Sequence, residues 1–229
     1  MKAPAGLLIV SGLRREAAIF AGPGARAICG DAATLRAKLA ELASPPSLVM
    51  SVGICGALDP GLRRGDIVLG TEVIAKNERL ATDSFLRHEL ARNLELAGRR
   101  SFLGSFAAAE APVLTAEAKA KLRAGTGAIA VDMESSIAAR FAAARGVPFG
   151  ILRAVCDAAN RDLPTFVAAA LSADGGVNIT AVLAGLIQRP GELPLLLAAA
   201  RDSYAAFTAL RCCRSLPGLF HGLGSVQLR

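Results

Sequence analysis

The chain has 229 residues and a mass of 23.5 kDa, a size that fits one compact α/β domain. Hydrophobic residues make up 53% of it and charged residues 20%, which supports a sizeable core and makes disorder a poor fit. Every apolar stretch is interrupted before the roughly 18 uncharged residues that a spanning helix needs, so we expect no transmembrane segment. The N-terminal apolar run is too short for a secretory signal, which indicates a cytoplasmic protein.

The charge balance favours anionic partners. The 26 Lys and Arg residues exceed the 19 Asp and Glu residues, giving a net charge of +7 that suits phosphate, a lipid surface or nucleic acid, or serves solubility alone. Nucleic acid fits least, because aromatic residues are only 4% and the basic residues are scattered. The 5 cysteines form no CxxC pair and there are only 2 histidines, so we expect reduced thiols and no metal site.

Apolar runs of strand length alternate with segments of helical period, the pattern of an α/β domain built around a largely parallel sheet. The first part of the chain predicts a strand at 6–12, a helix at 13–21, a strand at 27–30, a helix capped by Asp31 and reaching about Leu42, a strand at 47–53, a loop at 54–65 and a strand at 66–75. We find no internal repeat and no linker.

The second part continues the alternation. It predicts a helix at 83–97, a strand at 101–108, a strand leading into Asp132, a helix capped by Asp132 and ended by Gly146, a strand at 147–155 and a loop from Cys156. From residue 164 onward the pattern is helical, broken at 174–176 and 189–191, with a last helix to about Arg211. We therefore expect one domain over residues 1–211 and a tail over 212–229.

Polar residues and glycines follow four of the predicted strands, where ligands bind in open α/β sheets. These positions are Gly12 to Glu16, Gly53 to Gly56, Asp132 to Glu134, and Asp157. Glycines let backbone N–H groups approach an anion, arginines supply charge, and carboxylates act as acid, base or hydroxyl acceptor. The combination suits a sugar-phosphate or nucleoside site. Taken singly, each feature also has a structural explanation as a tight turn, a helix cap, a first-turn carboxylate or a solvated arginine.

Three motifs occur in order between Gly53 and Asn160: GICGALDPGLRRGDIVL, VDMES and RAVCDAAN. Together they resemble the nucleoside phosphorylase and nucleosidase superfamily, whose methylthioadenosine/S-adenosylhomocysteine nucleosidases carry GSAGGL…GDIVV, VEMEA and RAISDxAD. The later stretch LPTFVAAALSADGGVNITAVLAGLIQRPGELPLLLAAAR resembles the hopanoid-associated phosphorylases, which act on adenosylhopane. The resemblance covers most of the chain up to Cys212. It implies a three-layer α/β/α single domain with a central mixed, largely parallel sheet, the phosphorylase/hydrolase-like fold.

The resemblance also implies roles for individual residues. Asp157 corresponds to the general acid that contacts the purine, while Glu134 and Met133 correspond to ribose-binding residues. The purine-binding positions are Cys156, Glu110, Val113 and Val131. The phosphate-binding positions are Gly12, Arg14, Arg15, Gly53, Ile54 and Gly56. The sequence departs from its relatives at Cys156, Ile54, Cys55, Asp132 and Pro112, which replace Ser, Ser, Ala, Glu and an aromatic residue.

The implied reaction is cleavage of the N-glycosidic bond of an adenine nucleoside, in which protonation makes the base a better leaving group. The nucleosidases activate water with a glutamate of a GAMEEE-like turn, whereas this chain has GLRREA, with two arginines and only Glu16. The substitution favours phosphate as co-substrate, bound by Arg14 and Arg15, with no other cofactor. Two alternatives stay open: a hydrolytic nucleosidase that uses Glu16 and water, and a nucleoside- or lipid-binding module without catalysis.

The implied partners are a small adenine nucleoside, with or without a hopane tail, and further copies of the chain in a homodimer or larger homo-oligomer. A hopane tail requires that the site open onto an apolar surface. The Ala- and Leu-rich region from Leu163 to Ala200 has the composition for such a surface and for contact with a membrane surface. Core packing or an oligomer interface would use the same residues.

Overall fold

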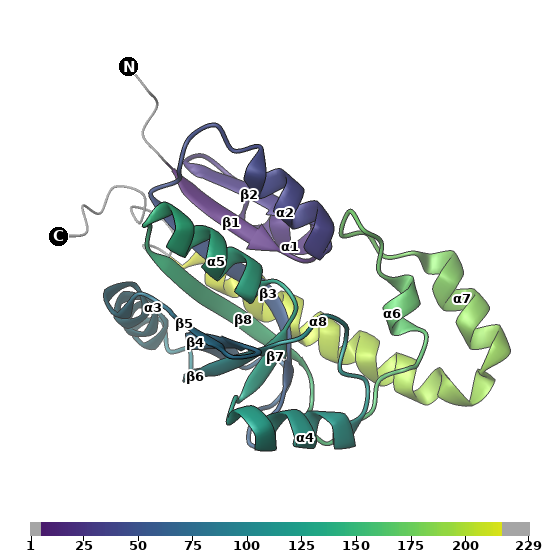
Figure 1. Ribbon diagram of the computed structural model, residues 1–229. Coiled ribbons are helices and arrows are strands. Elements are labelled where there is room, and N and C mark those ends of the chain that lie inside the picture. The colour runs from purple at the N-terminus through teal and green to yellow at the C-terminus, as the bar shows by residue number, and fades with distance from the viewer. Residues whose placement is uncertain (1–5, 217–229) are drawn as a thin grey trace.

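The computed structural model describes residues 6–216, and Figure 1 shows helices packed on both sides of a twisted sheet. The strands are β1 (Leu7–Ser11), β2 (Ala25–Cys29), β3 (Leu48–Ala57), β4 (Ile67–Ala75), β5 (Glu78–Ala81), β6 (Ser101–Ala108), β7 (Ala130–Asp132) and β8 (Phe149–Asp157). The helices are α1 (Arg14–Phe20), α2 (Ala32–Ala40), α3 (Ser84–Leu96), α4 (Ala116–Thr126), α5 (Ser135–Arg145), α6 (Val167–Ala170), α7 (Ile179–Gln188), the 3₁₀ turn η1 (Pro190–Glu192) and α8 (Leu193–Ser215).

The strands form one mixed sheet of eight strands. Its order is β2-β1-β3-β7-β6-β4-β5, and β8 pairs with both β3 and β4. Most pairings are parallel, as predicted, while β4 runs antiparallel to β5 and β8, and β3 meets β7 antiparallel at Gly56 and Ala57. Because β3 pairs with both β8 and β7, the hydrogen bonds close a ring of strands β3-β8-β4-β6-β7. This closure brings the ends of β3, β7 and β8 together.

Two apolar layers hold the helices on the sheet, so the predicted three-layer fold is confirmed. Leu8 and Val10 of β1 belong to the layer shared with α2 and α5, whereas Leu7 and Ile9 belong to the layer shared with α1, α3 and α8. All four side chains are at least 97% buried. Since side chains alternate between the faces of a strand, a strand covered on both faces needs a continuous apolar run, which explains LLIVS.

The predicted elements agree with the structure except at several boundaries. The loop predicted at 54–65 begins too early, because β3 continues to Ala57 by pairing with β8 and β7. The loop predicted from Cys156 is also placed too early, since β8 runs through Asp157. The last helix continues beyond Arg211 to Ser215, and residues 217–229 of the predicted tail lie outside the described residues. Two elements, β5 and α4, were not predicted.

The caps predicted at Asp31 and Gly146 are confirmed, whereas the N-cap position of α5 is Glu134 and not the predicted Asp132, which ends β7. The Asp31 carboxylate accepts a hydrogen bond from the Thr34 N–H at 2.8 Å, and Asp132 Oδ1 accepts one from the Ser135 N–H at 3.1 Å. Gly146 ends α5 in the left-handed conformation, with φ of 62°. These caps fix where α2 and α5 begin and end relative to the strands before them.

A helical arm formed by α6, α7, η1 and the first half of α8 extends away from the sheet (Figure 1). No residue of α7 is buried, and Ile179, Leu183 and Ile187, spaced four apart, are 63%, 54% and 81% exposed. Leu193, Leu197 and Tyr204 of α8 are exposed as well. The arm therefore exposes apolar side chains, while an opening of the site onto them stays a prediction. No helix among residues 6–216 has the length and hydropathy to cross a membrane.

Candidate active site

The ends of β3 and β8 bring the predicted carboxylates into one region. Gly53 pairs with Arg153, and Gly56 pairs with Asp157 across a bulge in the parallel ladder. β1 lies on the other side of β3 and leads into Gly12 and α1, while β7 meets Gly56 and leads into Glu134. The region therefore contains residues from four strand ends, as the sequence predicts.

The buried centre of the site is Arg153, whose side chain is 1% exposed. Its Nε lies 3.0 Å from Asp132 Oδ2, and its Nη1 lies 3.1 Å from Glu134 Oε2. Nη2 donates to Ser51 Oγ at 2.7 Å, and Nη1 also donates to the Ile54 carbonyl at 3.1 Å. The guanidinium therefore joins β3, β7 and the start of α5, and it orients the carboxylate of Glu134.

Glu16 lies in the same cluster and binds three backbone donors. Its Oε2 accepts hydrogen bonds from the N–H groups of Gly12 and Leu13 at 3.0 and 2.8 Å, and its Oε1 accepts one from Ile54 at 2.7 Å. The side chain is 1% exposed. The N–H groups of Gly12 and Ile54, which the sequence assigns to phosphate, thus converge on a carboxylate of the chain itself.

Burial perturbs the ionisation of both glutamates. Desolvation raises the pKa of Glu16, opposed by Arg153 and by the three backbone N–H groups. Desolvation, reinforced by Asp132 and Glu16 and opposed by Arg153, raises the pKa of Glu134 to about 7. Burial also disfavours the charge of Arg153, but the three carboxylates more than offset it and raise its pKa. Ionisable groups perturbed in this way are typical of active sites.

Two glycines of the site have no room for a side chain. A Cβ atom on Gly12 would lie 2.4 Å from Glu134 Oε1. A Cβ on Gly53 would lie 2.5 Å from Glu16 Oε1 and 2.8 Å from Arg153 Nη1. Gly56 has more space, since the nearest atoms, on Val131 and Asp157, would lie 3.1 and 3.2 Å away. Close approach of carboxylates to the backbone therefore explains the first two glycines.

Asp157 forms a second charged group next to this cluster. Its side chain is 7% exposed, and its Oδ2 lies 2.5 Å from Nζ of Lys119, an ion pair without an aligned hydrogen bond. Sγ of Cys156 lies 3.2 Å from Asp157 Oδ1. Burial, together with the nearby charge of Asp157, raises the pKa of the Cys156 thiol well above its usual range. Asp157 is thus held between a buried ammonium group and a neutral thiol.

Of the other predicted binding residues, Val131 and Val113 lie near Gly56, whereas the side chain of Glu110 lies on the surface. Val131 pairs with Gly56 and belongs to a small apolar cluster with Val113 packed against it. Met133 is half-buried between Asp132 and Glu134. Glu110, in contrast, has an 88% exposed side chain that pairs with Lys76 on the surface. The structure does not bring the Glu110 carboxylate to Asp157, and the role of Glu110 in binding the purine stays a prediction.

The two predicted phosphate arginines also lie outside the buried cluster. Arg14 is 63% exposed and forms an ion pair with Asp174, in the loop between α6 and α7. Arg15 lies over the ring of Phe207 in α8, with its Cζ 4.2 Å from the ring centroid. Both interactions point these side chains away from Glu16. Phosphate binding by Arg14 and Arg15 remains a prediction.

Sequence reasoning missed three residues of the site: Ser51, Lys119 and Arg153. Arg153 carries a visible signal, because it is a charge within the apolar strand FGILRAVCD. A buried strand position with a charged residue requires partners, and the carboxylates of VDMES supply them. Lys119 has no comparable signal, because it occurs among other charged residues in α4.

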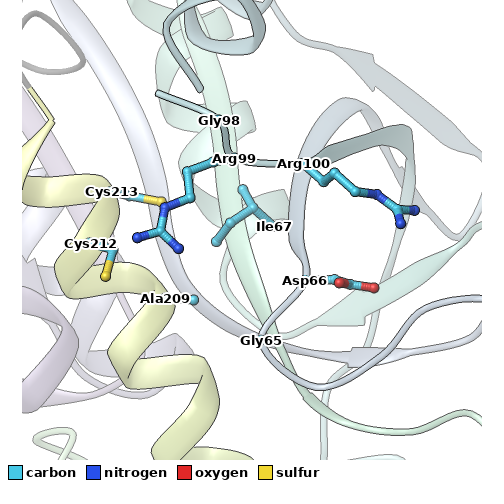
Figure 2. A pocket seen from close by; sticks show the side chains of 9 residues that line it. All are labelled: Gly65, Asp66, Ile67, Gly98, Arg99, Arg100, Ala209, Cys212 and Cys213. Carbon is cyan, nitrogen blue, oxygen red and sulfur yellow. The ribbon is translucent and has the colours of Figure 1, made fainter. Parts of the chain in front are cut away.

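A separate pocket of about 300 Å³ lies between α8 and the segments that precede β4 and β6 (Figure 2). Arg99, Cys212 and Cys213 face it from two sides. None of the residues that line it belongs to the clusters around Arg153 and Asp157. Among residues 6–216, no group of three or more His, Cys, Asp or Glu is arranged to hold a metal ion.

Fold and site together define a mixed-sheet α/β protein with buried acid–base groups at its strand ends. Residues 25–187 match the family model described as the Phosphorylase superfamily. Because the match covers most of the chain, the chain belongs to this superfamily. The matched segment contains Glu134, Arg153 and Asp157, and it begins after Glu16.

Solved structures share the fold at low sequence identity. The 5′-methylthioadenosine/S-adenosyl homocysteine nucleosidase of Campylobacter jejuni is 15% identical with a TM-score of 0.63, and the alignment covers 91% of this chain and 98% of that one. The corresponding Neisseria meningitidis nucleosidase is 19% identical with a TM-score of 0.59, covering 91% and 98%. The futalosine hydrolase of Helicobacter pylori is 15% identical with a TM-score of 0.62, covering 91% and 97%. These similarities establish the fold across the described domain.

Proposed function

We propose that the protein cleaves the N-glycosidic bond of an adenine nucleoside with water as the nucleophile. The observation that carries this proposal is the position of Glu16, which is buried beside Arg153 and Glu134 where the sequence analysis had favoured phosphate. The structural neighbours support it, since three are named as nucleosidases or a hydrolase and another, from Helicobacter pylori, holds 5′-methylthioadenosine in its active site.

The charge of the cluster favours water over phosphate. Asp132, Glu134 and Glu16 surround one guanidinium, so the carboxylates outnumber the only cation of this buried group. A phosphate dianion placed here would meet uncompensated negative charge at low effective dielectric. A water molecule has no such cost. A glutamate whose pKa is raised by burial is suited to accept its proton near neutral pH.

The remaining residues fit the parts of a glycosidase reaction. Glu134, oriented by Arg153, would accept hydrogen bonds from ribose hydroxyls and stabilise the positive charge that develops on the sugar. Asp157 would deliver a proton to the departing base, so that the electron pair of the broken bond leaves on a neutral purine. Val131 and Val113 provide an apolar surface next to Gly56 that suits a base.

Phosphorolysis is a second candidate, favoured by one observation. Three N–H groups, from Gly12, Leu13 and Ile54, bind the two oxygens of one carboxylate, which is an arrangement suited to an oxyanion as well as to Glu16. If Glu16 were displaced, a phosphate could take these donors. Arg14 and Arg15 would then have to leave Asp174 and Phe207.

For the identity of the substrate, we propose adenosylhopane, supported by the apolar surface of the helical arm. The loop between α6 and α7 of this arm touches the site: the Gly175 carbonyl accepts a hydrogen bond from the Arg14 N–H at 2.9 Å. A Cβ on Gly175 would lie 2.6 Å from the Gly12 carbonyl oxygen. The exposed stripe of Ile179, Leu183 and Ile187 follows directly, and it offers hydrocarbon contact to a large apolar 5′ group.

One assay tests these proposals. Adenine release is measured from adenosine, methylthioadenosine and adenosylhopane, each with and without phosphate, and the sugar product is identified. We expect free sugar without phosphate, a preference for adenosylhopane, and loss of about 10²- to 10⁴-fold in rate for Asp157→Asn. A phosphorylated sugar formed only with phosphate would establish phosphorolysis, and Arg14→Ala should then raise the KM for phosphate. No base release from any substrate would favour the binding module.

A further inference from the structure

Lys119 is a buried charged group that the proposed reaction leaves without a role. Its side chain is 1% exposed, although it extends from α4 at the edge of the molecule. Nζ donates hydrogen bonds to the carbonyls of Ala158 and Arg161, both at 2.9 Å, and lies 2.5 Å from Asp157 Oδ2. Burying an ammonium group is costly unless each proton faces an acceptor, and here the three oxygen atoms come from the end of β8 and the loop that follows it.

The ion pair creates a difficulty for Asp157 as an acid. Within an ion pair the carboxylate carries the negative charge, so it holds no proton that it can give to a departing base. A second group must therefore supply Asp157 with the proton that it passes to the base. The ammonium of Lys119 is in contact with Asp157 Oδ2, and this oxygen has no aligned hydrogen bond to another group of the described residues.

We propose that Lys119 supplies, through Asp157, the proton that the departing base takes up. This inference rests on the proposed function and adds the source of its proton. Lys119 does not touch the substrate, so it acts as a positioning and proton-supplying residue behind Asp157. The pair then behaves as one acid that shares a single transferable proton.

The proton transfers balance. An Nζ–H bond of Lys119 breaks as an O–H bond forms on Asp157, and this O–H bond breaks as an N–H bond forms on the base. The C1′–N bond breaks at the same time, and its electron pair remains on the base. Lys119 becomes a neutral amine with two N–H groups, which match the carbonyls of Ala158 and Arg161, and with a lone pair toward Asp157. Solvent returns the proton to Lys119 after the base leaves.

The neighbouring groups leave Lys119 as the proton source. The elements packed against Asp157 contribute the thiols of Cys156 and Cys55, and burial raises the pKa of both well above the usual range. A thiol whose pKa is raised is a weaker acid than an ordinary thiol, so both thiols are poor sources of a proton for Asp157. Gly56 also faces the carboxyl group and carries no ionisable side chain. The guanidinium of Arg161 lies in the same loop but pairs with Asp202 of α8.

The variant Lys119→Arg tests whether the site needs a proton from residue 119 or only its positive charge. Lys119→Arg keeps a cation beside Asp157, but a guanidinium does not release its proton in a protein. We expect Lys119→Arg to lower kcat for adenine release by about 10²- to 10⁴-fold, with little change in KM. Lys121→Met, an exposed lysine two residues further along α4, is the matched control and should retain the wild-type rate. Wild-type kcat in Lys119→Arg would overturn the proposal.

A second measurement does not depend on activity, and it uses Lys119→Met in place of Lys119→Arg. The ¹³C NMR signal of the Asp157 carboxyl, assigned by comparison with Asp157→Asn, reports its protonation directly. We expect a carboxylate in the wild-type protein at neutral pH, and a protonated carboxyl in Lys119→Met, where a buried carboxyl has lost its cation. A protonated Asp157 in the wild type, or a carboxylate in Lys119→Met, would overturn the proposal. If the wild type releases no base, the proposed function fails while these signals still decide whether Lys119 controls the proton of Asp157.

Discussion

Replacing Glu134 by glutamine measures the free energy that it costs the folded protein to ionise the Glu134 carboxyl. Desolvation, reinforced by Asp132 and Glu16 and opposed by Arg153, raises the pKa of Glu134 from 4.5 to about 7. At about 1.36 kcal/mol per pH unit, ionising this carboxyl costs the folded state on the order of 3 kcal/mol relative to the unfolded chain. Because the pKa is higher in the folded state, the free energy of unfolding keeps this contribution in full below pH 4.5, where the carboxyl is protonated. The contribution is lost as the pH rises to about 7.

The glutamine side chain resembles the protonated form at every pH. The free energy of unfolding of Glu134→Gln minus that of the wild type should therefore rise by on the order of 3 kcal/mol between about pH 4 and pH 8. Urea unfolding at constant ionic strength measures both free energies. Glu95→Gln, at an exposed position of α3, controls for the loss of one negative charge. A difference between Glu134→Gln and wild type that does not change with pH would refute the electrostatic reasoning.

Two further predictions concern the same cluster. Arg153→Met should destabilise the protein by about 3–5 kcal/mol near neutral pH, because it leaves buried carboxylates without their cation; an unchanged urea midpoint would contradict this. Gly53→Ala should reduce both stability and adenine release, since its Cβ would lie 2.5 Å from Glu16 Oε1. Gly125→Ala in α4, where a Cβ meets nothing within 4 Å, is the matched control. Equal melting temperatures for Gly53→Ala and Gly125→Ala would contradict this prediction, because they would show that the site around Gly53 accepts a Cβ atom.

Much of the fold could be predicted because its signals are local. Continuous apolar runs such as LLIVS mark strands covered on both faces, and Asp31 and Gly146 mark helix ends. The strand ends at Ala57 and Asp157 could not be predicted, because pairing with distant strands extends them through residues typical of loops. The ring closed by β3, β8 and β7 is likewise a property of pairing and leaves no mark in a single strand.

The candidate site was predictable in its carboxylates but not in their partners. Asp157 ends β8, Glu134 follows β7, and both belong to recognisable motifs, so the sequence indicated them. Lys119 lies 38 residues before Asp157, in a helix rich in charge, and nothing local distinguishes it from the exposed Lys121. Only the packing of α4 against the loop at Ala158 shows which lysine is buried.

The choice of nucleophile depends on which side of α1 faces the sheet. Consecutive residues of a helix point in directions about 100° apart, so Arg14, Arg15 and Glu16 cannot all face inward. The buried face of α1 consists of Glu16, Ala17 and Phe20, and the apolar residues after RRE already indicate this face in the sequence. Reading GLRREA for its net charge gives weight to the two arginines, whereas reading it as the first turn of an amphipathic helix directs the glutamate into the site. The helical geometry therefore favours Glu16 and water, and it turns the arginines toward Asp174 and Phe207.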